Sequence, residues 1–437
     1  MLKQSFPCYK NNDIKLNVDI FNYSYFRLSL GKIFMYSPKY RVLLVSSQTT
    51  QSSNYLQILA QDSRVEMLMA YCSLPDPKLW HGSESINKHV FDTQVLEGYP
   101  WVYVPNYSPF PSLSKAFGLI NLGLVKLVPQ FDCCIVYGHA FISFWLAILI
   151  SKLLSKPLLL STDATYLEPI SGGESWKIPI KRLFLPFLYK YIADGVLVPS
   201  TASKRFLESL NVDSERIFIT PYVVDNEGIA KTAQLTNRNQ IRAEWQVPID
   251  AVVVVFCAKF IPRKRPQDLV KAFALANVAN SYLVLVGDGP LKESLQEEVE
   301  QLGIAERVKF LGFVKYSLLP QVYASSDLLV HPAEWEPYGL PVNEAMVCGI
   351  PVVVSDRVGA RYDLVQENLA GFTYPSGDVE ALASILKTTL GNQETLKQMG
   401  KAATERMKTW SFRENAEAHV EAVKKLMIEK NKKVHKS

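Results

Sequence analysis

The stretch HPAEWEPYGLPVNEAMVCGIPVVVSD, residues 331–356, has the pattern of a strand end, a loop, a helix and a second strand. The runs DLLVHP (327–332) and PVVVS (351–355) are short, apolar and β-rich, which is typical of buried strands. Pro341 suits the first turn of a helix, where its missing N–H costs nothing. The stretch therefore predicts a strand–helix–strand unit, the repeating element of a parallel α/β sheet.

Runs of the same kind recur along the chain, and helical stretches lie between several of them. The predicted strands are 41–46, 65–72, 101–105, 132–138, 157–161, 195–199, 217–221, 251–258, 282–287, 307–312, 327–332, 351–355 and 371–375. The predicted helices are 141–156, 203–211, 265–277, 291–303, 378–390, 393–409 and 412–430. Strands that are buried on both faces and alternate with helices predict α/β domains with parallel sheets, so we expect two doubly wound, Rossmann-like domains facing each other across a cleft.

The length of 437 residues suits two large domains, and the polar, strandless residues 226–249 suggest where they join. We expect the N-terminal extension to be disordered or to come from an upstream start codon. The predicted divisions are an extension at 1–34, an N-terminal acceptor domain at 35–226, a linker at 227–249, a C-terminal donor domain at 250–410, and a crossing helix with a basic tail at 411–437.

Composition excludes several classes of protein. Hydrophobic residues make up 48% and charged residues 20% of the chain, which is ample for packed cores. The 21 glycines and 25 prolines are an ordinary share, so collagen-like and low-complexity proteins are excluded. A net charge of +5 is too weak to predict a nucleic-acid partner. The six cysteines form no C-x-x-C pair and lie mostly in apolar runs, which favours reduced cysteines inside the cell. No secretory h-region is visible, so we expect a cytoplasmic protein, with membrane association left open.

The helix predicted after Gly339 points its free N–H groups and positive dipole end towards the expected cleft, which makes an anion site. Glu336 and Glu344 stand eight residues apart, on either side of the helix start, so both can face one ligand. An anion on the amides with carboxylates beside it suits a nucleotide sugar, whose hydroxyls donate to the glutamates. The alternative is a capped helix with surface carboxylates.

A second stretch, FCAKFIPRKRPQDLVKAF (256–273), places Lys259 after a buried strand and Lys264 at a helix start. Cations at the carboxyl end of a strand, facing the helix anion site, can hold a diphosphate. The alternative is that both lysines are solvated loop residues.

These residues carry a resemblance to a known family. HPAEWEPYGLPVNEAM resembles the E-x7-E motif of glycosyltransferase family 4, the group 1 glycosyltransferases, with Glu336 and Glu344 as its glutamates. AKFIPRKRP is similar to the family's G-R-L-x-P-x-K-G loop, and LVGDGPLKESL and GIPVVVSDRVGA follow in the family's order. FDTQVLEGYPWVYVPN and IFITPYVVDN match more loosely, so the resemblance covers roughly 41–428.

The resemblance implies a GT-B fold, with the helix 412–430 crossing back to the first domain, and a retaining transfer from a nucleotide-diphosphate sugar to a glycan or lipid-linked acceptor. It implies that Glu336 and Lys264 are the catalytic residues, with Glu336 on the transferred sugar. The donor-binding residues that it implies are Lys259 and Lys264 on the diphosphate, the amides of Gly339 and Leu340 beside them, Glu344 on the ribose, and Gly312 and Phe313, within 312–314, on the base.

The sequence also departs from the family pattern. Ala258–Lys259 replaces the usual Gly-Arg, which loses the bidentate arginine grip, and Arg265 replaces the glycine after the lysine. SSQTTQSSNY (46–55) replaces a glycine-rich loop. On the acceptor side, Asp163 stands where many members have a histidine, and His139 is the histidine that remains. A capping or core role for His139 is an equal alternative.

We expect no metal and no cofactor. The sequence has no D-x-D pair and no metal-ligand cluster, so lysines and helix amides must meet the charge of the leaving diphosphate. Within enzymes, the rival functions are a nucleotide-sugar epimerase or hydrolase. A rival of another class is a non-catalytic nucleotide-sugar-binding subunit, suggested by the departures at Ala258 and Lys259.

The segment ESWKIPIKRLFLPFLYKYI (174–192) mixes basic and aromatic residues, which is typical of a contact with a membrane surface. The alternative is an amphipathic helix that covers its own sheet.

Overall fold

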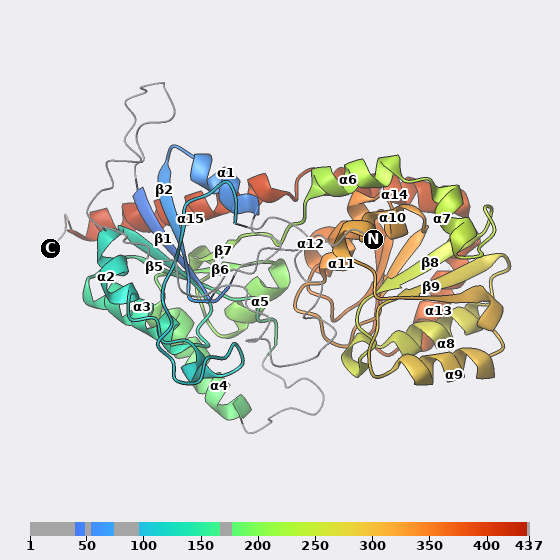
Figure 1. Cartoon of the computed structure of the whole chain (residues 1–437), viewed down its shortest axis with the longest axis horizontal. Helices are drawn as coiled ribbons and strands as arrows, with labels where there is room; N and C mark the ends of the chain where they lie inside the picture. The colour runs from blue at the N-terminus through green and yellow to red at the C-terminus, as the bar shows by residue number, and fades with distance from the viewer. Residues whose placement is uncertain (1–39, 49–53, 74–95, 167–176, 435–437) are drawn as a thin grey trace, which may run out of the picture. The chain divides into compact units, whose positions relative to one another are not determined.

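The computed structural model describes residues 40–48, 54–73, 96–166 and 177–434. It confirms the α/β prediction, because the strands form two sheets in which every pair of neighbours is parallel (Figure 1). All thirteen predicted strands are present. The predicted extension at 1–34 lies outside the described residues.

The first sheet has the strand order β3-β2-β1-β4-β5-β6-β7. Its strands are β1 Tyr40–Ser46, β2 Val65–Tyr71, β3 Trp101–Tyr103, β4 Cys133–Tyr137, β5 Leu158–Ser161, β6 Gly195–Val198 and β7 Ile217–Ile219. The helices between them are α1 Tyr55–Gln61, η4 Ala116–Gly118, α2 Leu124–Leu127, η5 Val128–Gln130, α3 Ile142–Leu153, α4 Lys177–Phe187, η6 Leu188–Ile192, α5 Thr201–Ser209 and η7 Ser214–Arg216.

The second sheet has the order β10-β9-β8-β11-β12-β13. Its strands are β8 Val252–Cys257, β9 Ser281–Val286, β10 Val308–Gly312, β11 Leu328–His331, β12 Val352–Ser355 and β13 Gly371–Tyr374. The accompanying helices are α6 Asn226–Leu235, α7 Arg238–Glu244, η8 Pro262–Lys264, α8 Pro266–Ala276, α9 Lys292–Gln301, η9 Ala305–Arg307, η10 Tyr316–Leu318, α10 Leu319–Ala324, α11 Leu340–Val347, α12 Arg361–Leu364, α13 Val379–Leu390, α14 Gln393–Met407 and α15 Phe412–Val434.

Both sheets are buried on both faces, as the continuous apolar runs of their strands predict. Alternate residues of one strand enter different cores. In β8, Val253 and Val255 pack in one apolar cluster, and Val252 and Val254 pack in the cluster on the other face. Because strand side chains alternate in this way, a shift of one residue in register would exchange the two faces.

The last helix, α15, packs against the first sheet and confirms the predicted crossing. It contacts α1, β6 and β7 (Figure 1), and its buried Val420 and Val423 belong to the same apolar cluster as β1 and β2. His419 Nε2 lies 2.9 Å from the Tyr137 hydroxyl. Burial lowers the pKa of His419 to about 4, so its ring is neutral at pH 7 and no charge is buried in the core.

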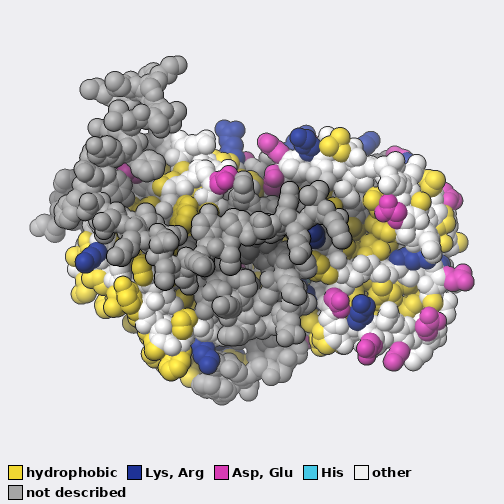
Figure 2. Space-filling model, in the orientation of Figure 1, with side chains coloured by type: hydrophobic (Ala, Val, Ile, Leu, Met, Phe, Trp, Pro, Cys, Tyr) yellow, Lys and Arg dark blue, Asp and Glu magenta, His cyan; other side chains and the backbone are white. Residues whose placement is uncertain are grey.

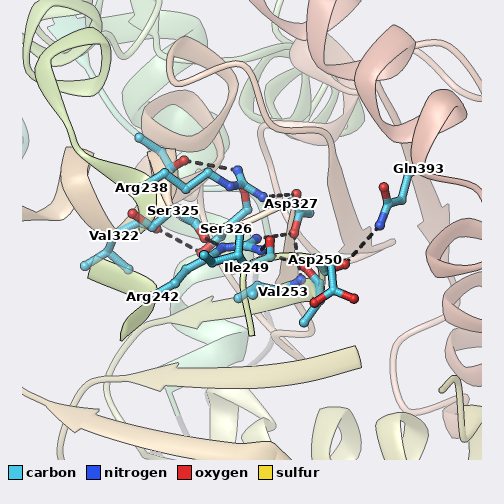
Figure 3. A network of polar contacts seen from close by, with 12 residues as sticks. Arg238, Arg242, Ile249, Asp250, Val253, Val322, Ser325, Ser326, Asp327 and Gln393 are labelled. Carbon is cyan, nitrogen blue, oxygen red and sulfur yellow. Dashed lines mark hydrogen bonds and ion pairs between the residues drawn. The ribbon is translucent and has the colours of Figure 1, made fainter. Parts of the chain in front are cut away.

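The polar stretch predicted as a linker contains two helices, α6 and α7, and α7 is anchored to the second sheet (Figure 3). Asp327, just before β11, accepts hydrogen bonds from Arg238, from Arg242 at 2.6 Å and from the Val253 backbone N–H at 2.7 Å. The Arg242 side chain is 1% exposed and also donates to the carbonyls of Ser325, Ile249 and Ala251. Asp327 and Ser325 lie 85 and 83 residues from Arg242 in the sequence, which explains why the polar composition alone looks like a linker.

We predict that Asp327→Ala destabilises the protein by about 3–5 kcal/mol, because it leaves a buried guanidinium without its counter-charge. Asp250→Ala is the matched control. Asp250 lies in the same network, but its carboxylate contacts only the exposed side chain of Asn280, at 2.9 Å, among the hydrogen bonds of the described residues. We expect this control to stay within about 0.5 kcal/mol of the wild type. Urea unfolding measures both, and equal stability of the two variants would contradict the anchoring role.

Candidate functional site

The site is built at the start of α11. β11 ends at His331, and the chain then reaches α11 through Gly339, whose φ of +103° is strained for any residue with a side chain. A Cβ at this position would also meet Val358 Cγ1 at 3.1 Å and Glu336 Cγ at 3.4 Å. The glycine is therefore required by both conformation and space, and it exposes the first N–H groups of α11.

The loop after β12 holds the backbone of Glu336 in place. Glu336 N donates to Arg357 O at 3.2 Å, and Gly359 N donates back to Glu336 O at 3.0 Å. A Cβ at Gly359 would overlap the carbonyl oxygen of Pro337, so this close packing requires a glycine. The position of Glu336 thus depends on two loops that follow neighbouring strands of one sheet.

Glu336 and Lys264, the two predicted catalytic residues, form a buried ion pair. Lys264 Nζ contacts Glu336 Oε2, and the two side chains are 10% and 14% exposed. His331 Nε2 lies 3.3 Å from the same carboxylate oxygen. The sequence alternative, in which Lys264 and Glu336 are solvated surface charges, is therefore wrong for these two residues.

Lys264 reaches the site because the chain turns sharply after it. Lys264 ends η8, and Arg265 has a φ of +48° before α8 begins. This is the position where the family pattern has glycine, so the substitution carries a backbone cost of order 1–3 kcal/mol. The Arg265 side chain offsets part of it through an ion pair with Asp268, with Nε 2.5 Å from Oδ2.

Several cations surround Lys264. Burial, and then the charges of Arg263 and Lys259, lower the pKa of Lys264, while the touching Glu336 carboxylate opposes that lowering. Lys259 is exposed, and Arg263 lies over the Trp335 ring with its Cζ 5.6 Å from the centroid. The predicted diphosphate-binding lysines therefore lie in one positive region, with Arg263 as an additional member.

Glu344 lies deeper than the sequence suggests. Its residue is 5% exposed, and its Oε2 accepts a hydrogen bond from the Tyr323 hydroxyl at 2.7 Å. Burial raises the pKa of Glu344 to about 7. Glu344 lies in the second turn of α11, one turn after the helix start. Its role on the ribose stays a prediction.

The base-binding residues that the sequence predicts lie at the end of β10. Gly312 has a φ of +67°, and its carbonyl accepts a hydrogen bond from Gly287 N at 2.9 Å. The Phe313 side chain is 53% exposed. Leu340, whose amide is the other predicted phosphate ligand, is half-buried at the first position of α11.

The predicted acceptor residues follow neighbouring strands of the first sheet. His139 follows β4 and packs between Phe184 and Tyr189, with its Nδ1 3.3 Å from the Tyr189 hydroxyl. Burial and the charge of Lys181 lower the pKa of His139, so it is neutral at pH 7. Asp163 follows β5 and is exposed. Their acceptor roles stay predictions.

Sequence reasoning missed two residues of the site, His331 and Arg263. His331 is fully buried as the last residue of β11, and burial, Lys264 and Arg263 hold its pKa well below the usual range. Its Nδ1 has no hydrogen-bond partner among the described residues. A neutral ring with its proton on Nε2 therefore donates to Glu336. A histidine that ends a strand directly before a glutamate motif is the signal that could have found it.

The described residues offer neither a metal site nor a disulfide bond. They contain no group of three or more His, Cys, Asp or Glu side chains placed to hold a metal ion. Four of their five cysteines are buried, and none of the five is paired with another.

Part of the chain is similar to a known family of enzymes. Residues 237–406 match the sequence model of the group 1 glycosyl transferases. The sulfoquinovosyl transferase SQD2 of Arabidopsis thaliana is 30% identical over 61% of this chain and 51% of its own length. The N-acetyl-alpha-D-glucosaminyl L-malate synthase of Bacillus anthracis is 33% identical over 38% of this chain and 43% of its own length. The chain thus spans about half the length of these relatives.

Solved structures share the fold across most of the chain. A glycosyltransferase from Rickettsia africae superposes with a TM-score of 0.65 at 16% identity, covering 89% of this chain and 99% of that one. The Anabaena protein Alr3699/HepE, solved with UDP, also gives 0.65, at 19% identity, covering 88% of this chain and all of that one. These likenesses confirm the GT-B architecture. Residues 237–406 match the model of the group 1 glycosyl transferases, the family that the sequence motifs of the chain resemble.

Proposed function

We propose that this protein is a retaining glycosyltransferase that moves a sugar from a nucleotide-diphosphate sugar to an acceptor hydroxyl. The observation that carries the proposal is the buried Lys264–Glu336 pair beside the start of α11. A buried ammonium and a buried carboxylate beside free helix amides suit a ligand that has both an anionic diphosphate and a sugar.

Donor binding exchanges the partner of Lys264. In the donor-free protein Glu336 neutralises the ammonium. A diphosphate on the amides of Gly339 and Leu340 takes that place, with Lys259 as a second cation. Glu336 is then released towards the sugar, still held by its contact with His331. Uridine diphosphate is the nucleotide we propose, supported by the fold shared with a protein solved with UDP and with UDP-glucose.

The transfer needs little covalent chemistry from the protein. The acceptor hydroxyl attacks the anomeric carbon from the face that the diphosphate leaves. The bond between that carbon and the diphosphate oxygen breaks, and the departing oxygen takes the acceptor proton. Lys264 and the α11 amides stabilise the charge growing on the diphosphate, and Glu336 stabilises the positive charge developing on the sugar. We propose that no metal takes part, because Lys264 and the α11 amides stabilise the diphosphate charge that a metal ion would otherwise stabilise.

A membrane contact is the second part of the proposal. α4 and η6 bury Leu185, Leu188 and Tyr189 in the apolar core, so the sequence alternative of a helix covering its own sheet holds for one face. The opposite face exposes a stripe at helical spacing: Ile180, Leu183, Phe187 and Tyr191, between 53% and 81% exposed. Residues 174–176 of the predicted segment lie outside the described part.

Charge favours an anionic lipid surface. Lys181 and Lys190 are exposed beside the stripe, and residues 141–161 and 177–193 contain no Asp or Glu. α3 exposes Leu149 and Leu153 as well, and Figure 2 shows hydrophobic side chains gathered over the region where Figure 1 places α2 and α3. None of the described helices is both long and apolar enough to cross a bilayer. We therefore propose a peripheral contact on the cytoplasmic face, where a lipid-linked acceptor would be reached.

We predict that Lys264→Gln and Glu336→Gln each lower kcat by about 100–1000-fold, because each removes a charge that the transition state needs. The donor is first identified by thermal shift with a panel of nucleotide sugars, since a donor at 100 times its Kd stabilises by about 2.7 kcal/mol. Release of nucleotide is then followed, with a membrane extract supplying the acceptor. Lys271→Gln, which breaks only an ion pair of a 52% exposed lysine, is the control.

The products separate the proposal from its rivals. Native rates in both variants would show that this is not the active site. If the wild type binds the donor without transferring its sugar, the non-catalytic subunit is favoured. Release of free sugar would indicate a hydrolase, and an altered sugar that is still attached to its nucleotide would indicate an epimerase. Activity is expected to survive EDTA, and a loss that manganese or magnesium restores would contradict metal independence.

For the membrane, we predict that the wild type sediments with phosphatidylglycerol vesicles at low salt and is released as salt rises. The Leu183→Ser/Phe187→Ser variant should lose most of this binding, because it removes two exposed apolar side chains. Leu275→Ser is the control, because Leu275 is 60% exposed on α8 of the second sheet. Equal sedimentation of the two variants would contradict a membrane contact through the stripe.

A further inference from the structure

A surface cavity of about 360 Å³ lies where α4, α5 and α12 meet the loop after β5. Its walls include Arg182, Arg205, Thr165, Tyr166 and Tyr362, and none of the described residues that line it is acidic. We propose that this cavity binds a phosphate-type oxyanion carried by the acceptor. The role as an acceptor site rests on the proposed glycosyl transfer, whereas the oxyanion site itself does not.

Arginines are held around the cavity by aromatic rings instead of carboxylates. Arg205 Cζ lies 4.2 Å from the centroid of the Tyr362 ring, and Arg361 Cζ lies 3.9 Å from the same centroid. Arg357 Cζ lies 5.3 Å from the centroid of the Tyr166 ring. Arg361 Nη2 also donates to the Tyr362 hydroxyl at 2.5 Å. Stacking on a ring orients a guanidinium and occupies few of its N–H donors, so others remain for a ligand.

These arginines lack carboxylate partners in the part of the chain that the structure describes: Arg182, Arg205, Arg357 and Arg361 form no ion pair there. Asp363, next to Tyr362, has both carboxylate oxygens engaged by the N–H and the hydroxyl of Thr201, at 2.9 and 2.5 Å. The Asp363 carboxylate also interacts with the charge of Arg205, so it compensates part of the cluster, and the repulsion among the remaining arginines is unfavourable in the empty protein. An anionic ligand would relieve that repulsion.

A buried hydroxyl in the wall supplies an independent sign of a ligand. Thr165 is 5% exposed, and its Oγ1 has no hydrogen-bond partner among the described residues. An unpaired buried polar group costs about 1–3 kcal/mol, so this hydroxyl is expected to have a partner that the described residues do not supply. A phosphate oxygen accepts from both a hydroxyl and a guanidinium, which a neutral sugar cannot match in strength.

The cavity is joined to the donor site through a single loop. Arg357 and Gly359 hold the backbone of Glu336, and Tyr362, three residues after Gly359, lines the cavity. Thr165 and Tyr166 follow β5, on the same lip as Asp163. A ligand in the cavity therefore lies next to the loop that supports Glu336, as an acceptor must. The volume exceeds what a phosphate needs and leaves room for the group that it is attached to.

The test measures binding of sn-glycerol 3-phosphate by calorimetry with saturating UDP present, so that the donor phosphate site is filled. We expect saturable binding to the wild type and binding at least about tenfold weaker for Arg182→Gln/Arg205→Gln, which removes two charge-assisted contacts. Thr165→Val should weaken binding severalfold without lowering Tm. Lys204→Gln is the control, because it removes a charge from α5 outside the cavity and should bind like the wild type.

A second arm uses phosphatidylcholine vesicles with and without phosphatidic acid. Arginine-dependent binding of glycerol 3-phosphate alone indicates a soluble phosphorylated acceptor. Arginine-dependent binding of phosphatidic-acid vesicles alone indicates a lipid headgroup, and either result supports the site. No saturable binding of either probe, or equal binding by the wild type and the double arginine variant, overturns it. UDP affinity, measured in parallel, reports on the proposed function separately and is expected to be unchanged in the double variant.

Discussion

The contact between Lys264 and Glu336 is the interaction on which the site depends. Either charge alone would be costly in a position that is about nine-tenths buried, so each residue requires the other. Lys264 is delivered by the turn after β8, and Glu336 by the loop between β11 and α11. The parallel order of β8 and β11 in one sheet brings these two loops to the same edge. The fold thus creates an ion pair that a bound diphosphate could break by replacing Glu336 as the partner of Lys264.

The surroundings of this pair make the exchange productive. His331 contacts the same oxygen of Glu336 that Lys264 contacts, so the carboxylate keeps one partner when the lysine turns to the diphosphate. His331 stays neutral, because burial and two nearby cations disfavour its charged form. A charged histidine would compensate the carboxylate and weaken its action on a cationic sugar. In the proposed mechanism, Glu336 would therefore retain its negative charge for the transition state.

The sequence predicted the sheets well because buried parallel strands are nearly continuous apolar runs, and such runs are local signals. α6 and α7 escaped prediction, since what stabilises α7 is Asp327, far away in the sequence. The glutamate motif placed Glu336 before the helix start, where the structure has it, but the depth of Glu344 follows from its place in the second turn of α11 and its contact with Tyr323. The arginine-lined cavity combines α4, α5 and α12, and no local pattern announces such a combination.

The central claim is that Lys264 leaves Glu336 for the donor diphosphate, and the affinity for UDP-glucose between pH 6 and 9 tests it most directly. In the free protein, burial and the charges of Arg263 and Lys259 lower the pKa of Lys264, and the contact with Glu336 opposes that lowering. A bound diphosphate would raise the pKa, so affinity should fall as pH rises towards 9. In Lys264→Gln the affinity should be weaker and nearly independent of pH over this range. Equal affinities, or the same pH dependence in both proteins, would contradict the account.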